Sequence, residues 1–203
     1  MYLHMEKIQW EMLSPDEIQV RLKEVLGEEN YNKVSSPSIN WQTNNEDMAQ
    51  YFDSVLNPID AKMRSIYEES TLPIIESRLD EVGEKHKDII KEGEIDGFKK
   101  CLEEYVHDRI VTISGNLGGA INCNMVGDQE GAIRWETAFL SRFQETGPQE
   151  LKDVNGILDG VYARAGEEIT PPPFAFDHAD YTPPDNKRNY VDAIKIYDLL
   201  QSD

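Results

Sequence analysis

The stretch that decides the fold of this chain is Ser14-Pro-Asp-Glu-Ile-Gln-Val-Arg-Leu-Lys-Glu-Val-Leu26. Ser14 and Glu17 have the spacing of a capping box, in which each side chain accepts a hydrogen bond from the other residue's backbone N–H. Pro15 suits the first helical position, where a backbone N–H has no partner. The apolar residues that follow recur at helical spacing, namely Ile18, Leu22, Val25 and Leu26. The stretch predicts an amphipathic helix that begins directly after Ser14.

Apolar stripes of the same kind predict further helices along most of the chain. They lie within residues 45–67, 71–90, 95–106, 128–146, 151–162 and 190–200. Pro58 is expected to kink the first of these segments or divide it, Gly93 to end the second, and Gly147 with Pro148 to end the fourth. The predicted fold class is mainly α, a single helical domain of about seven helices.

Two segments carry patterns that are typical of strands. Ile8, Trp10 and Met12 alternate with polar residues, which is the period of a short strand. Residues 110–126 hold two short runs of β-forming residues with three glycines between them. We interpret this segment as either a small hairpin or a loop between helices. The expected fold therefore allows a short N-terminal strand and a hairpin near 110–126.

Residues 167–203 differ in composition from the rest, because they begin with a proline-rich segment and end in a helical pattern. Phe174, Phe176 and Tyr181 lie in the proline-rich segment, and such aromatic residues favour packing against a surface over a free linker. We predict an acidic helical body over residues 1–166 and a packed C-terminal arm over 167–203. The three aromatic residues are candidates for binding a partner.

The chain has 39 acidic and 20 basic residues, which gives a formal net charge of −19. Residues 1–50, 51–100, 101–150 and 151–203 carry net charges of −5, −4, −5 and −5. An acidic tail would concentrate the charge in one block, so the acidity belongs to the surface of the folded protein. A surface of this sign repels phosphate backbones, which tells against direct nucleic-acid binding.

Two further patterns indicate the compartment. Cys101 and Cys123 form no CxxC pair and no zinc-ribbon spacing, so we expect free thiols in a reducing environment. The first residues lack the apolar run of a signal peptide, and no stretch approaches the roughly 18 apolar residues of a membrane span. We expect a cytoplasmic protein that does not bind a membrane.

The densest group of metal-binding or acid–base residues lies in the segment predicted to be helical near residue 104. Glu104 and His107 are three residues apart, as in the ExxH element of di-iron helical bundles, so both side chains can reach one divalent metal ion. His86 is the nearest further ligand, and Glu76 or Glu136 the nearest further carboxylate. The chain contains no second ExxH element, and a solvated helix face is the alternative interpretation.

Three functional hypotheses follow. The preferred one is a non-enzymatic acidic binding or inhibitor protein, which engages a basic partner such as a nuclease toxin or a nucleic-acid-binding protein through its carboxylate-rich helices. The second is a metal-dependent helical-bundle enzyme that uses Glu104 and His107. The third is a subunit of a larger assembly that docks through the C-terminal arm. No motif assigns a catalytic residue or an organic cofactor, since both the GxSxG elbow and the Walker sequence are absent.

Overall fold

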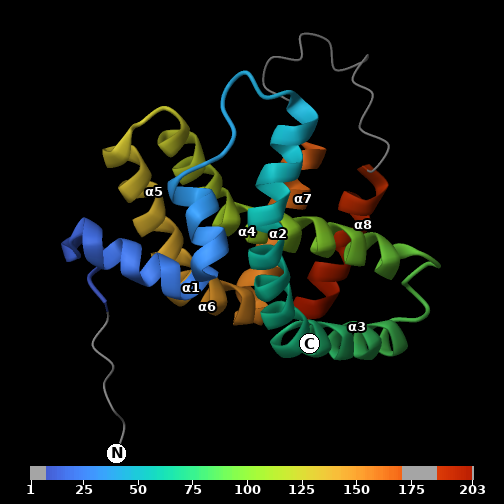
Figure 1. Cartoon of the computed structure of the whole chain (residues 1–203). Helices are drawn as coiled ribbons and strands as arrows, with labels where there is room; N and C mark the ends of the chain where they lie inside the picture. The colour runs from blue at the N-terminus through green and yellow to red at the C-terminus, as the bar shows by residue number, and fades with distance from the viewer. Residues whose placement is uncertain (1–7, 171–186, 203) are drawn as a thin grey trace, which may run out of the picture. The chain divides into compact units, whose positions relative to one another are not determined.

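The structure is a computed structural model that describes residues 8–170 and 187–202. Its elements in chain order are η1 (Trp10–Met12), α1 (Pro15–Ser35), α2 (Asn45–Ser70), α3 (Leu72–Lys85), α4 (Glu94–Met125), α5 (Gln129–Ser141), the π-helical turn η2 (Arg142–Thr146), α6 (Gly147–Lys152), α7 (Val154–Ile169) and α8 (Lys187–Gln201), as Figure 1 shows. No strand occurs among residues 8–170 and 187–202. The prediction of a mainly α fold is confirmed.

The residue contacts concentrate in two compact units, which we describe separately. Unit 1 comprises Met1–Met63 and Ile110–Pro148, and unit 2 comprises Arg64–Arg109 and Gln149–Asp203. The predicted boundary between a body over residues 1–166 and an arm over 167–203 stays a prediction. The candidate partner-binding residues Phe174, Phe176 and Tyr181 lie outside the residues that the structure describes.

The predicted start of α1 is confirmed in detail. The Glu17 backbone N–H donates to Ser14 Oγ over 3.4 Å, and the Ser14 backbone N–H donates to Glu17 Oε2 over 2.8 Å. These bonds hold the pKa of Glu17 below its ordinary value, because Ser14 donates to the ionised carboxylate. At Gly27 the backbone leaves the helical region, with φ at 75°, a conformation that glycine adopts without steric cost. The element α1 is therefore two helical segments joined at Gly27.

The core of unit 1 is built from apolar side chains of η1, α1, α2, α4 and α5. Its buried members are Trp10, Ile18, Leu22, Leu26, Val34, Val55, Ile59, Leu117, Ala120, Ile121, Phe139 and Leu140. Phe139 also stacks on Phe143, with ring centroids 5.2 Å apart. The apolar stripe of α1 that the sequence predicts is thus buried against α5 and its neighbours in this unit.

The two strand-like segments are both helical, which corrects those expectations. Residues 10–12 form a single 3-10 turn, in which Trp10 is buried and Met12 is 78 % exposed. The segment near 110–126 belongs to the long helix α4, whose buried residues there recur at helical spacing: Ile110, Ile113, Leu117, Ala120 and Ile121. The glycines between the two runs mark close packing and not a turn, since the ring of Trp135 lies where a Cβ on Gly119 would stand.

Two predicted helix ends also differ from the structure. α3 ends at Lys85 and not near residue 90. His86 is its C-cap, and Ile89, the next apolar residue, is 55 % exposed. Gly93, at φ 85°, lies in the turn before α4 instead of ending α3. Pro58 lies inside α2, which continues through it as one helix.

Gly147 and Pro148 do not end the helical path that starts at Gln129. The path passes through the π-helical turn and continues as α6, in which Pro148 lies in the first turn. Pro148 lies two residues after the π-helical turn, and the fixed φ of proline suits a helical backbone. The Gly147 backbone N–H donates to the carbonyl of Arg142, so the turn holds one residue more than an α-helical turn.

The core of unit 2 brings α7 close to α4 and α8. The ring of Tyr105 in α4 occupies the place that a side chain on Gly160 in α7 would take, so glycine at this position allows the two helices to approach closely. Gly156, one helical turn earlier in α7, lies against the capping side chain of Asp153. Asp192 of α8 lies against Gly97 of α4.

Candidate functional site

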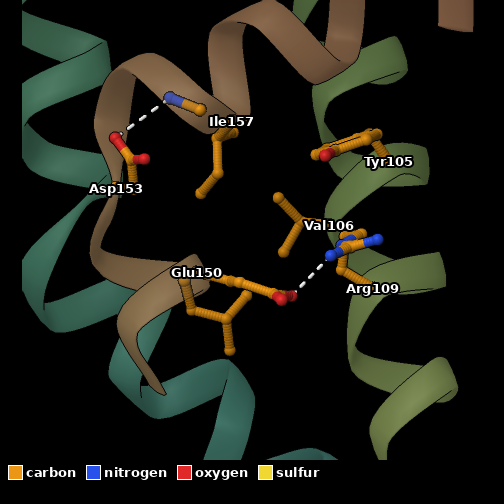
Figure 2. Close-up of a pocket in the computed structure, with 8 residues that line it drawn as sticks. Tyr105, Val106, Arg109, Glu150, Asp153 and Ile157 are labelled. Atoms are coloured by element: carbon orange, nitrogen blue, oxygen red, sulfur yellow. Dashed lines mark hydrogen bonds and ion pairs between the residues drawn. The ribbon is translucent and has the colours of Figure 1, made fainter. Parts of the chain in front are cut away.

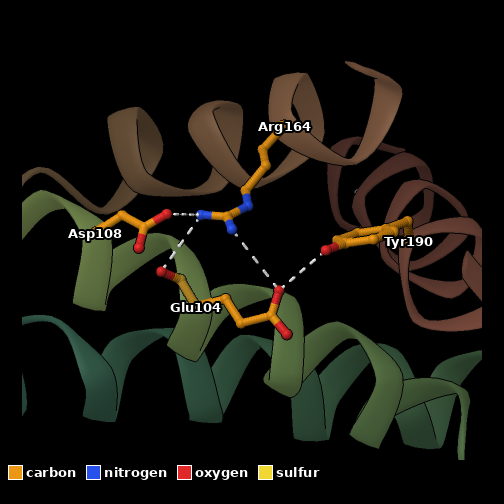
Figure 3. A network of polar contacts seen from close by, with 4 residues as sticks. All are labelled: Glu104, Asp108, Arg164 and Tyr190. Atoms are coloured by element: carbon orange, nitrogen blue, oxygen red, sulfur yellow. Dashed lines mark hydrogen bonds and ion pairs between the residues drawn. The ribbon is translucent and has the colours of Figure 1, made fainter. Parts of the chain in front are cut away.

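Glu104, the central residue of the predicted metal site, belongs to a polar network in unit 2. Figure 3 shows Arg164 of α7 between Glu104 and Asp108 of α4, with Tyr190 of α8 approaching Glu104. Tyr190 Oη donates to Glu104 Oε2 over 3.2 Å, and Arg164 Nη2 lies 3.9 Å from the same oxygen. Burial lowers the pKa of Arg164, but its bond to Asp108 and the charge there raise it more. Glu104 therefore joins three helices through Arg164 and Tyr190.

The other two predicted metal ligands take different places. His107 is exposed on α4, and His86 is a half-buried residue that caps the end of α3. Within the described residues, no group of three or more His, Cys, Asp or Glu side chains is placed to hold a metal ion. The ligand set of Glu104, His107 and His86 stays a prediction, with no formed site to support it.

Replacing Arg164 by methionine is expected to lower the free energy of unfolding by about 1–2 kcal/mol, because it removes the hydrogen bonds of this half-buried guanidinium to Asp108 and to the Glu104 carbonyl. Arg134→Met is the matched control, since its pair with Glu130 is 75 % and 79 % exposed, and we expect it to cost less than about 0.5 kcal/mol. Urea unfolding of both variants measures the difference. Equal losses would mean that the Arg164 network is only a surface ion pair.

A small pocket lies between α4, α6 and α7 in unit 2, with a volume of about 160 Å³ (Figure 2). Its charged side chains are already engaged. Arg109 forms an ion pair of 2.5 Å with Glu150, and Asp153 accepts from the Gly156 backbone N–H over 3.0 Å. We assign no ligand to this pocket, because each of its charged side chains already has an ion-pair or hydrogen-bond partner.

A second pocket of unit 2 is bordered by carboxylates. It has a volume of about 180 Å³ and is lined by Tyr67, Leu72, Glu76, Leu79, Lys99, Leu102 and Glu103. The Tyr67 side chain is 1 % exposed, and its hydroxyl has no hydrogen-bond partner among the described residues. Burial and the charges of Glu103, Glu76 and Glu68 raise the pKa of Tyr67, so the hydroxyl stays protonated at neutral pH.

The three carboxylates around Tyr67 come from three helices: Glu68 from α2, Glu76 from α3 and Glu103 from α4. All three side chains are exposed, and we call them the acidic face of unit 2. Glu103 is paired with Arg64 at 2.6 Å. Glu68 and Glu76 take part in no ion pair within the described part of the chain. Two carboxylates of the acidic face can therefore pair with an added cation. Lys99 is the one basic residue that lines the pocket.

Glu136 is the functional candidate that sequence patterns identify least well. It is 2 % exposed, the lowest value among the described carboxylates, and it borders a pocket of about 500 Å³ in unit 1. Burial raises the pKa of Glu136 to about 7, although a hydrogen bond with Asn124 opposes the shift. The sequence names Glu136 only as a possible further carboxylate of the metal site, and no such site is formed within the described residues. Its place between Ala132 and Phe139, on the buried side of α5, is the sequence signal for its burial.

Comparisons with protein-family models, with curated proteins and with solved structures found no match to this chain. Among the described helices, none is sufficiently long and apolar to cross a membrane.

The prediction of free thiols is confirmed, because neither Cys101 nor Cys123 forms a disulfide. Burial and the charge of Glu104 raise the pKa of Cys101 to about 12, so that thiol is not a nucleophile at neutral pH.

Proposed function

We propose that this protein is a non-enzymatic binding or inhibitor protein, which engages a basic protein partner through the acidic face of unit 2. The observation that carries the proposal is the convergence of Glu68, Glu76 and Glu103 on Tyr67, whose hydroxyl has no partner among the described residues. Glu76 and Glu103 also line the pocket that Tyr67 borders. A nuclease toxin or a nucleic-acid-binding protein has the required basic surface, which is built to meet phosphates.

The chemistry of the pocket fits the end of a lysine or arginine side chain. The carboxylates attract the cation, and the protonated Tyr67 oxygen accepts a hydrogen bond from an ammonium or guanidinium N–H. Because the carboxylates are exposed, they act mainly by raising the association rate, and their effect weakens with salt. Leu72, Leu79 and Leu102 provide apolar contact for the methylene stem of such a side chain.

Capture from a native lysate, followed by elution at increasing salt, tests the proposal. The variant Glu68→Lys/Glu76→Lys reverses the two carboxylates of the acidic face that have no ion pair. The control Glu24→Lys/Glu167→Lys reverses two exposed carboxylates in α1 and α7 and gives the same net charge. We expect the first variant to capture about tenfold less basic protein than the wild type does, and the control to capture nearly as much as the wild type.

Three results would each contradict the proposal: capture of no basic protein, capture that does not change with salt, or equal losses in the two variants. The last result would mean that net charge alone attracts the partner.

The two other hypotheses from the sequence stay predictions. A metal-dependent enzyme using Glu104 and His107 requires a ligand group, and none is formed within the described residues. Docking of a larger assembly through Phe174, Phe176 and Tyr181 concerns residues outside the described part of the chain.

A further inference from the structure

The pocket of unit 1 beside Glu136 has the features of a built polar site. Helices α1, α4 and α5 all contribute to its lining, which consists of Pro15, Gln19, Ser35, Asn124, Gln129, Glu130, Ala132, Ile133, Arg134 and Glu136. Its volume of about 500 Å³ is in the range of pockets that hold small ligands. Three of these side chains are amides and one is a hydroxyl, so the lining is rich in neutral hydrogen-bonding groups around one buried carboxyl group.

The Glu136 carboxyl group is only half satisfied by the protein. Asn124 provides a hydrogen bond to it, and the same Asn124 amide donates to the Val34 carbonyl over 2.9 Å, which fixes its position. The second oxygen, Glu136 Oε2, is buried and has no hydrogen-bond partner among the described residues. An unpartnered carboxylate oxygen in this environment costs free energy, so a bound donor would stabilise it.

Within residues 8–170 and 187–202, no cation is paired with this carboxylate. The other charged residues of the lining are Glu130 and Arg134, and they form an exposed ion pair with each other. Two events can therefore neutralise Glu136: it takes up a proton, or a positively charged ligand enters the pocket. Protonation is favoured at low pH, whereas binding of the cation becomes favourable once the carboxyl group has ionised.

We propose that this pocket binds a cationic nitrogen group, a guanidinium or an ammonium, whose N–H donates to Glu136 Oε2. The group belongs either to a free small amine or guanidine, or to a lysine or arginine side chain of a protein. The amides of Gln19, Asn124 and Gln129 supply further carbonyl acceptors for the remaining N–H groups. This site lies in unit 1 and does not rest on the acidic face of unit 2, so either proposal can fail without the other.

Binding of such a group is linked to the proton on Glu136. The cation binds the ionised carboxylate, whereas the empty site holds a proton up to about pH 7. Affinity is therefore expected to rise with pH and level off above about pH 7, and to be about 100-fold weaker at pH 5. No histidine lines the pocket, and its two other charged residues, Glu130 and Arg134, pair with each other.

NMR titration of the full chain with two probes tests the site: agmatine for a free guanidine, and acetyl-Gly-Arg-Gly-amide for a protein side chain. The peptide containing citrulline in place of arginine is the neutral control. We expect at least one cationic probe to shift the signals of Asn124 and Glu136 and to bind at least about tenfold more tightly than the citrulline peptide. Binding of agmatine alone would indicate that the ligand is a free guanidine. Binding of the arginine peptide would indicate that the ligand is a protein side chain.

Glu136→Gln keeps the shape of the side chain and removes its charge, so it is expected to lose at least about tenfold in affinity for the cationic probe. Glu24→Gln, an exposed carboxylate of α1 outside the pocket, is the matched control and should bind as the wild type does. The pH dependence of wild-type binding provides an independent readout, even where a variant fails to fold. The proposal is overturned if neither cationic probe shifts these signals, if citrulline binds equally well, or if affinity does not fall below pH 7.

Discussion

Glu136→Gln is expected to be free of a pH effect that the wild type shows. The wild type is expected to lose about 3 kcal/mol of its free energy of unfolding as the pH rises from about 4.5 to about 8. The folded protein holds the Glu136 proton up to about pH 7, whereas the unfolded chain releases it near the ordinary value of 4.5. Between these values the unfolded state binds fewer protons, so stability falls as pH rises. The loss is complete above the folded-state pKa.

Urea unfolding at a series of pH values measures this effect as the difference between variant and wild type. Glu24→Gln removes a carboxylate that is exposed on α1, and it should follow the wild-type pH profile. The two variants change net charge equally, so only the burial of Glu136 separates them. Parallel profiles for wild type and Glu136→Gln would show that the carboxyl group is solvated in solution.

Gly147→Ala is expected to destabilise unit 1 by about 2–3 kcal/mol, because the added methyl group has no free space. A Cβ on Gly147 would lie 2.6 Å from the Arg142 carbonyl oxygen, 2.6 Å from Ile113 Cδ1 and 2.7 Å from Met63 Cε. The first of these atoms belongs to the backbone of the π-helical turn, so a change of side-chain rotamer cannot relieve the clash.

Gly115→Ala provides the matched control in the same unit. Gly115 lies in α4, is exposed, and has no atom within 4 Å of the place of its Cβ. Alanine there should stabilise the helix by up to about 1 kcal/mol through its higher helical propensity. Thermal unfolding of both variants gives the comparison. A neutral Gly147→Ala would mean that the π-helical turn rearranges at no cost.

The features of the fold that depend on neighbouring residues in the chain could be predicted. The capping box of Ser14 and Glu17 acts over three residues, and it begins α1 as expected. The prediction of a hairpin or loop near 110–126 is wrong, because the glycines there resemble turn residues. In the structure Gly118 and Gly119 accommodate the rings of Phe52 and Trp135, which are distant in the sequence.

The candidate sites depend on such distant contacts, and the sequence therefore predicts them poorly. The spacing of Glu104 and His107 does place both on α4, but Arg164, 60 residues later, engages Glu104. Glu68, Glu76 and Glu103 lie on separate helices, and no local pattern distinguishes them from other exposed carboxylates. The burial of Glu136 arises from the packing of α5 in unit 1, although its place in the chain resembles many acidic helix positions.

An NMR titration with an oligolysine peptide tests the acidic face of unit 2 most directly. We expect the largest changes at Glu68, Glu76 and Glu103 and in the Tyr67 ring signals, and we expect them to disappear at about 1 M salt, where charges are screened beyond about 3 Å. Shifts spread over all acidic helices in proportion to their exposed carboxylates would contradict the proposal. They would show that the protein attracts cations by its net charge and has no particular binding face.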